Sequence, residues 1–81
     1  MRARIEWALE ASEAVRELPA AEQDEIFEKL DLLIYFPRMY RVQTGKRFRR
    51  YRRFVAGNWI VFYRVEGQTV YVRGIWPARM P

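Results

Sequence analysis

Two dipeptides that begin with glycine, Gly57-Asn58 and Gly67-Gln68, constrain the fold of this 81-residue chain more than any other feature. They separate three runs in which apolar residues alternate with polar ones: RYRRFVA, WIVFYRVE and TVYVRGIW. A period of two is typical of β-strands, and a two-residue link with glycine first favours a type I′ or II′ hairpin. The sequence therefore predicts a three-stranded antiparallel meander.

The two links also predict which residues face each other. Counting outward from them pairs Ala56 with Trp59 and Val61 with Gly74, and it places Phe62 across from both Arg53 and Arg73. One face should be an apolar platform of Phe54, Ala56, Trp59, Val61, Tyr63, Val65, Val70, Val72 and Trp76. The opposite face should mix aromatic, aliphatic and guanidinium groups: Tyr51, Arg53, Val55, Ile60, Phe62, Arg64, Tyr71, Arg73 and Ile75.

In the first half of the chain the apolar period changes to three or four. RARIEW reads as a short strand, followed by a helix over about residues 8–18 that Pro19 ends. A second helix follows in PAAEQDEIFEKLDLLIYFP, with an apolar stripe of Ile26, Leu30 and Leu33 and a stop at Pro37. The predicted class is α+β, in the order β-α-α-β-β-β, with a helical hairpin packed on one face of a small, mainly antiparallel sheet. Residues 1–81 should form a single domain because the chain is too short for two cores.

The distribution of charge also differs between the helical first half of the chain and the β-rich second half. The net charge is +5, but residues 1–37 hold nine acidic and four basic side chains, whereas residues 38–81 hold eleven basic side chains and one acidic. Six of the eight residues from Lys46 to Arg53 are basic. Such asymmetry indicates partners of opposite charge, and we expect the first part of this run to be a loop that serves electrostatic steering.

The mixed face predicts a binding surface. Arginines can contact phosphate, and exposed rings can stack on unpaired bases. An acidic protein segment is a second candidate ligand, and a third interpretation is that arginines and rings only support one another across the strands. A membrane is the weaker candidate because the basic residues lie on a predicted sheet and not on an amphipathic helix.

Catalysis, metal binding and a cofactor are not favoured. The chain contains no histidine and no cysteine, so the usual near-neutral acid–base group and the thiolate nucleophile are missing. A metal-independent cleavage of phosphodiesters stays open, with arginines stabilising the transition state and a tyrosine handling protons. The absence of cysteine, of a signal-peptide pattern and of a long apolar run leads us to expect a cytoplasmic protein.

The chain also resembles a known family along nearly its whole length, from about Ile5 to Arg79. IEWALEASEAVRELP, LDLLIYFPRMYR and RRFVAGNWIVFYRVEGQTVYVRGIWPAR are similar to successive segments of the RelE/ParE-superfamily toxins of type II toxin–antitoxin and plasmid-stabilisation modules. The GNW…FYR hairpin looks closer to the ParE branch. The family likeness implies the same β-α-α-β-β-β order, a cognate antitoxin as partner in a hetero-oligomer, and growth arrest when the toxin is free.

The two branches imply different targets. A ParE-like toxin is expected to poison DNA gyrase without catalysis of its own, whereas a RelE-like toxin cuts mRNA on the ribosome. A relative without toxicity, binding RNA or protein, is the remaining alternative. Residues expected to bind target, nucleic acid or antitoxin are Arg49, Arg50, Tyr51, Arg52, Arg53, Phe62, Arg64, Tyr71, Arg73 and Arg79. If the chain is RelE-like, the resemblance implies that Arg53, Arg64 and Arg79 hold phosphate and that Tyr51 or Tyr71 stacks the base. The chain departs from the RelE pattern, because the positions that match the nuclease residues look like Tyr51, Arg53 and Ile60 and no tyrosine follows Tyr71. It also departs from the ParE pattern, because it has IWPAR after the last strand, with Trp76 where ParE-like chains often have histidine.

Overall fold

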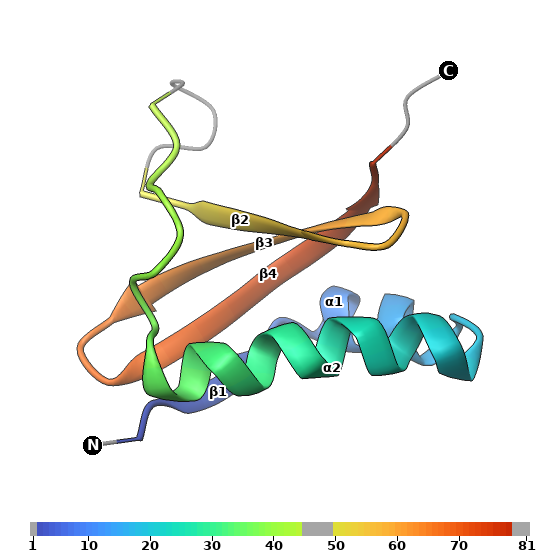
Figure 1. The fold of residues 1–81 in the computed structure, drawn as a ribbon, viewed down its shortest axis with the longest axis horizontal. Coiled ribbons are helices and arrows are strands. Elements are labelled where there is room, and N and C mark those ends of the chain that lie inside the picture. The colour runs from blue at the N-terminus through green and yellow to red at the C-terminus, as the bar shows by residue number, and fades with distance from the viewer. Residues whose placement is uncertain (1, 45–49, 79–81) are drawn as a thin grey trace.

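The computed structural model describes residues 2–44 and 50–78. Its elements are β1 (Arg4–Trp7), α1 (Leu9–Arg16), α2 (Ala20–Tyr35), β2 (Arg52–Ala56), β3 (Trp59–Glu66) and β4 (Thr69–Pro77). Both helices lie on one side of a four-stranded sheet, as Figure 1 shows. The predicted β-α-α-β-β-β order is confirmed.

The sheet is mixed, with strand order β1-β4-β3-β2. The meander of β2, β3 and β4 is antiparallel as predicted, and β1 pairs in parallel with β4, Ile5 lying opposite Val70. The connection between β1 and β4 runs through both helices, β2 and β3, so it is long enough for a parallel pair. β1 and β2 are therefore the two edges of the sheet.

Both predicted hairpin links are confirmed. Ala56 pairs with Trp59 across the first link, and Glu66 pairs with Thr69 across the second. Gly57 and Gly67 have φ angles of 59° and 56°, in the region that glycine adopts without steric cost. Among the described residues other than glycine, only Arg50 has a positive φ angle, so each hairpin has it at the first link position alone, as in a type II′ turn.

The core lies between the helices and one face of the sheet. The predicted helical stripe of Ile26, Leu30 and Leu33 is buried, and Ile5 and Trp7 of β1 pack against the same cluster. From the meander the core receives Phe54, Ala56, Val61, Tyr63, Val70 and Val72. Burial of one such aliphatic side chain stabilises the fold by about 1.5–3 kcal/mol. The platform predicted from the alternation is therefore largely confirmed.

A β-bulge changes the register in the second half of β4. Tyr63 pairs with Val72, but Phe62 pairs with Gly74, which leaves Arg73 as the extra residue. Two predictions are wrong for this reason: Val61 lies opposite Ile75 and not Gly74, and Phe62 does not lie across from Arg73 in a regular pair. The next two residues, Ile75 and Trp76, therefore lie on the faces opposite to those predicted. Ile75 packs against the core, and Trp76, predicted in the platform, lies on the other face against Phe62.

Candidate binding face and helix groove

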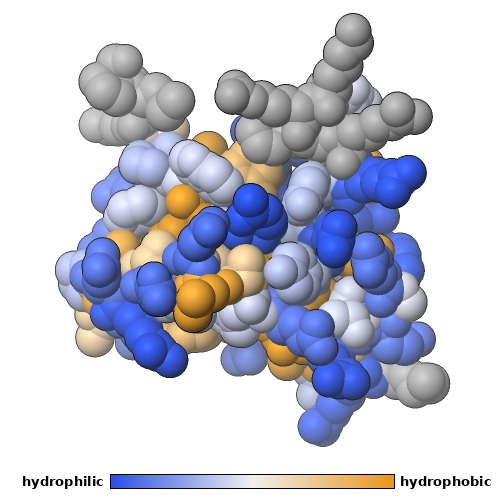
Figure 2. Space-filling view, turned by 180° about the vertical axis from the view of Figure 1, so that it is seen from behind, coloured by the Kyte–Doolittle hydropathy of each residue, from blue (hydrophilic) through white to orange (hydrophobic). Residues whose placement is uncertain are grey.

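The side of the sheet that the helices leave uncovered is called here the outer face. Its described side chains on the meander are Arg53, Val55, Ile60, Phe62, Arg64, Tyr71, Arg73 and Trp76. Apart from Trp76, these are the residues that the period of two predicted. Alternation places them there because the intervening residues, such as Phe54, Val61 and Val72, are buried in the core. Figure 2, which shows the molecule from behind relative to Figure 1, has hydrophobic residues exposed among hydrophilic ones on that side.

Three arginines of the outer face come from three different strands. The Arg64 guanidinium lies over the Tyr71 ring at 5.1 Å, and its Nε is 3.3 Å from a carboxylate oxygen of Glu66. Arg73 pairs with Glu10 of α1, also at 3.3 Å. Within the described part of the chain Arg53 has no ion pair, and it lies opposite Phe62. Among the described residues, the outer face therefore has two arginines with intramolecular partners and one, Arg53, without an ion pair.

The remaining residues of the predicted site are elsewhere or outside the described residues. Arg49 and Arg79 belong to the latter group, together with the first part of the basic run. Arg50 is exposed in the turn before β2, and Tyr51 is half-buried. Arg52 lies opposite the buried Tyr63, on the helix side of the sheet, where its guanidinium donates hydrogen bonds to the carbonyl oxygens of Arg38 and Tyr40. Through these hydrogen bonds Arg52 holds the connector between α2 and β2 against the sheet.

Apolar side chains form a row across the end of the outer face next to the first hairpin. Val55 pairs with Ile60, and Ile60 pairs with Trp76. Val55 is 53% exposed and Trp76 is 42% exposed, whereas Phe62 beside them is only 7% exposed. The Phe62 ring meets the Trp76 ring edge-on, with 5.0 Å between the ring centroids. We call Val55, Ile60 and Trp76 the apolar strip.

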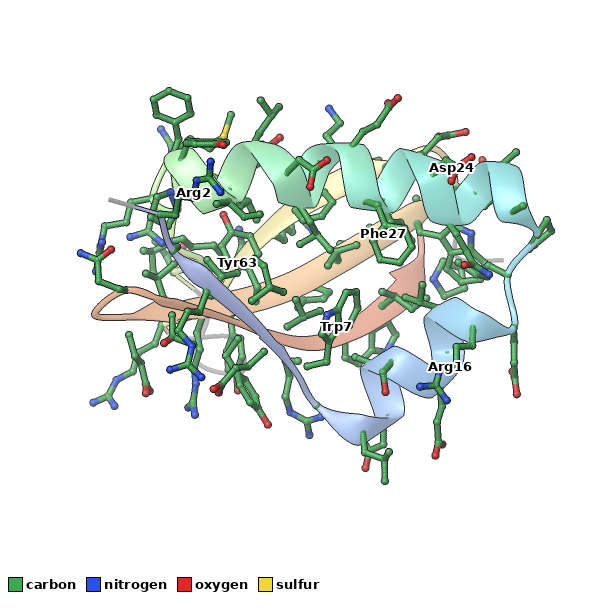
Figure 3. The ribbon with its side chains drawn as sticks, turned by 90° about the horizontal axis from the view of Figure 1, so that it is seen from below. Arg2, Trp7, Arg16, Asp24, Phe27 and Tyr63 are labelled. Atoms are coloured by element: carbon green, nitrogen blue, oxygen red, sulfur yellow. The ribbon has the colours of Figure 1, made fainter. Side chains whose placement is uncertain are left out.

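A groove of about 240 Å³ opens on the opposite side of the molecule, between the two helices and β1. Its lining residues are Trp7, Ser12, Val15, Arg16, Gln23 and Phe27. Trp7 and Phe27 meet edge-to-face at 6.2 Å, and Figure 3 shows both rings between the helices with Arg16 extending from α1. The Ser12 hydroxyl and the Gln23 amide donate to backbone carbonyls, so the groove has an apolar floor, and Arg16 at its rim has no ion pair among the described residues.

Tyr63 is the one described group whose acidity the fold clearly shifts. Burial raises its pKa above the usual range of a phenol, and the nearby Arg52 opposes this shift in part. Its hydroxyl has no hydrogen-bond partner in the described part of the chain. The side chain is fully buried in the core, away from both the outer face and the groove, so it stabilises the fold and does not serve either surface.

Residues 2–44 and 50–78 contain no cluster of three or more acidic, histidine or cysteine side chains that could hold a metal ion. No described helix is both long and apolar enough to cross a membrane.

The sequence alone did not locate the groove, and of the apolar strip it placed Val55 and Ile60 on the outer face but put Trp76 on the other face. The groove requires Trp7 of β1 to lie beside both helices, and no local pattern indicates that contact. The strip did have a signal, because an isolated glycine inside a strand pattern often marks a bulge, and Gly74 lies next to the extra residue Arg73.

Comparisons with known proteins identify the family. A family model described as the ParE toxin of the type II toxin–antitoxin system parDE matches residues 5–81. No curated protein matches the chain.

Solved structures agree on the fold. The RelE–RelB complex from the archaeon Pyrococcus horikoshii contains a chain that matches over the full length of both chains, with 21% identity and a TM-score of 0.77. The isolated Escherichia coli RelE toxin matches 98% of this chain and 87% of its own, with 14% identity and a TM-score of 0.82. The RelBE2 toxin–antitoxin complex from Mycobacterium tuberculosis matches 95% of this chain and 99% of its own, with 15% identity and a TM-score of 0.81.

At these identities the structural likeness shows the fold alone, and the family model, which matches almost the entire chain, decides the assignment. The chain belongs to the ParE toxin family of type II toxin–antitoxin systems, within the RelE/ParE superfamily.

Proposed function

We propose that this toxin arrests growth by binding DNA gyrase and poisoning it, without a catalytic step of its own, and that a cognate antitoxin neutralises it in a hetero-oligomer. The observation that carries the proposal is the match of the ParE toxin model to residues 5–81. Gyrase poisoning is the activity that the resemblance to the ParE branch implies.

The composition of the outer face supports binding over cleavage. Arg64 and Arg73, two of the arginines considered for phosphate contact, each have a carboxylate partner 3.3 Å away within the chain. Tyr71, considered for stacking on a base, already lies beneath the Arg64 guanidinium. A nuclease site of this kind needs these groups at the phosphate and the base, so substrate would have to replace their internal contacts, which for pairs as exposed as these contribute less than about 1 kcal/mol each.

Supercoiling assays test the gyrase target directly. Purified toxin added to DNA gyrase and relaxed plasmid is expected to inhibit supercoiling, and cleaved gyrase–DNA complexes should accumulate on treatment with detergent and protease. Boiled toxin and toxin premixed with antitoxin are the controls. Full supercoiling at a stoichiometric excess of toxin would contradict the proposal.

Ribosome-dependent cleavage of mRNA is the second candidate function. It is favoured by the presence of Arg53, Arg64 and Tyr71 on one face. Primer extension on mRNA isolated after induction distinguishes the two functions. Codon-phased cuts that disappear in the Arg53→Ala/Arg64→Ala variant would support cleavage, whereas growth arrest without such cuts supports the gyrase target.

The helix groove is the surface proposed for part of the antitoxin. Its floor of Trp7, Val15 and Phe27 can receive a bulky apolar side chain, and the free Arg16 at its rim can pair with a carboxylate of a flexible, acidic antitoxin segment. Arg16→Glu should weaken neutralisation while growth arrest persists. Lys29→Glu, the same charge change on α2 outside the groove, is the matched control and should leave neutralisation intact.

A further inference from the structure

The apolar strip lies where a solvated sheet would normally carry polar residues. Val55, Ile60 and Trp76 are in cross-strand register, so they form one continuous row over β2, β3 and β4. Val55 and Trp76 remain 53% and 42% exposed, and no described element covers them. Contiguous exposed apolar residues on a small domain mark a surface that another molecule covers.

The fold contains two local devices that bring Trp76 to this row. The bulge at Arg73 moves Trp76 from the helix side of the sheet to the outer face. Gly74 then leaves space for the indole, because a Cβ atom at position 74 would lie 2.8 Å from two carbons of the Trp76 ring. The ring rests on Gly74 and against Phe62 with part of its surface exposed. Trp76 is thus held by two neighbours in one orientation, as an anchor residue of an interface requires.

The charges around the strip distinguish a protein ligand from a nucleic acid. A phosphate backbone is bound by several free cations, each of which releases a counterion. On the described outer face Arg64 and Arg73 are already paired with Glu66 and Glu10, and Arg53, beside the strip, is the free guanidinium. A row of apolar side chains next to one free arginine matches a protein segment that presents an apolar side chain and a neighbouring carboxylate.

We propose that the apolar strip is the surface through which the toxin binds its protein target, with Trp76 as the anchor and Arg53 as the partner of a target carboxylate. This inference rests on the proposed function, because it requires that the target be a protein. It goes further by assigning the contact to four residues of the outer face, the three of the apolar strip and Arg53.

The test measures the affinity of the full-length toxin for purified DNA gyrase, with inhibition of supercoiling as a second readout. Trp76→Ala is expected to weaken binding at least about tenfold, as truncation of an interface tryptophan does. Val55→Asp should have a similar effect, and because Val55 is exposed this second variant decides the matter if Trp76→Ala fails to fold. Trp76→Phe should retain most of the affinity. Leu9→Ala, which truncates an exposed apolar residue of α1, is the control and should bind as the wild type does.

A single-stranded oligonucleotide, titrated over a salt series, is the competing probe. Loss of gyrase binding in Trp76→Ala and Val55→Asp, with oligonucleotide binding unchanged, supports the inference. Gyrase binding within twofold of the wild type in both variants overturns the inference and leaves the gyrase target standing. Loss of oligonucleotide binding alone also overturns it, since nucleic acid would then occupy the strip. If the wild type neither binds nor inhibits gyrase, the proposed function fails and the inference fails with it.

Discussion

The two faces of the meander are built from the same strands but are stabilised in different ways. The helix-covered face is filled mainly by aliphatic and aromatic side chains, including Val61, Tyr63 and Val72 with no exposed surface. The outer face has apolar residues too, but pairs of charges lie among them and water reaches the rings of Tyr71 and Trp76. Burial on the first face holds the fold together, whereas the second face can change its side chains at little cost in stability and is therefore the one free to bind.

Truncation of one core residue and one outer residue gives the largest contrast. Leu33→Ala should lower the free energy of unfolding by about 3 kcal/mol, because it removes a fully buried side chain and leaves a cavity. Val55→Ala on the outer face should change it by less than about 0.5 kcal/mol. Urea denaturation followed by circular dichroism measures both values. Similar losses in the two variants would show that the outer face also contributes to the stability of the core.

Substitution of the two hairpin glycines tests whether the helical layer restrains one end of the sheet more than the other. Gly57 and Gly67 both have positive φ angles, so alanine at either position should cost about 1–2 kcal/mol. A Cβ atom at Gly57 would also meet the Glu25 carboxylate of α2, whereas at Gly67 it would meet no atom within 4 Å. Gly57→Ala should therefore be slightly the more destabilising in thermal unfolding. Adding Glu25→Ala should remove this excess, and an unchanged difference would contradict the explanation.

The contrast between the faces also explains how far the sequence could predict the molecule. Alternation located the core residues because burial on one face imposes a strict period, and the glycine links set the register next to each turn. It failed at Arg73, where a single extra residue reverses the faces of Ile75 and Trp76. Hydrophobic alternation does not record such an insertion, although Gly74 was a local sign of it.

Contacts between distant segments were beyond the reach of any local pattern. The parallel pairing of β1 with β4 joins the two ends of the chain, and Glu10 reaches Arg73 across 63 positions of sequence. Arg53, Arg64 and Tyr71 were correctly placed on one face, but which arginines have acidic partners could only be seen in three dimensions. The charge count of the sequence therefore overstates the free positive charge of the described outer face.

Tyr63 allows the buried face to be probed by pH. Because burial raises the pKa of its phenol, the folded protein keeps the proton in a range where the unfolded chain loses it. The neutral phenol thus favours folding fully below about pH 10, and this contribution falls as pH rises further, by about 1.4 kcal/mol per pH unit. Tyr63→Phe should differ from the wild type by no more than about 1 kcal/mol at pH 7, since the hydroxyl has no partner to lose. Above pH 10 the free energy of unfolding of Tyr63→Phe, measured by urea denaturation, should rise relative to that of the wild type. Parallel pH profiles of the two proteins would contradict the argument.

The smallest expected effect on stability concerns the Glu10–Arg73 pair, and it addresses the outer face most directly. Glu10 is 82% exposed and Arg73 is 47% exposed, so Glu10→Gln should change the free energy of unfolding by less than about 0.5 kcal/mol. The same substitution frees a guanidinium on the outer face. If intramolecular pairing is what keeps this face from binding phosphate, affinity for a single-stranded oligonucleotide should rise, and the dependence of log K on log salt should steepen by about 0.7. Glu13→Gln makes the same change in net charge on α1 without freeing an arginine, so an equal gain in both variants would show that overall charge, and not the release of Arg73, governs the binding of nucleic acid.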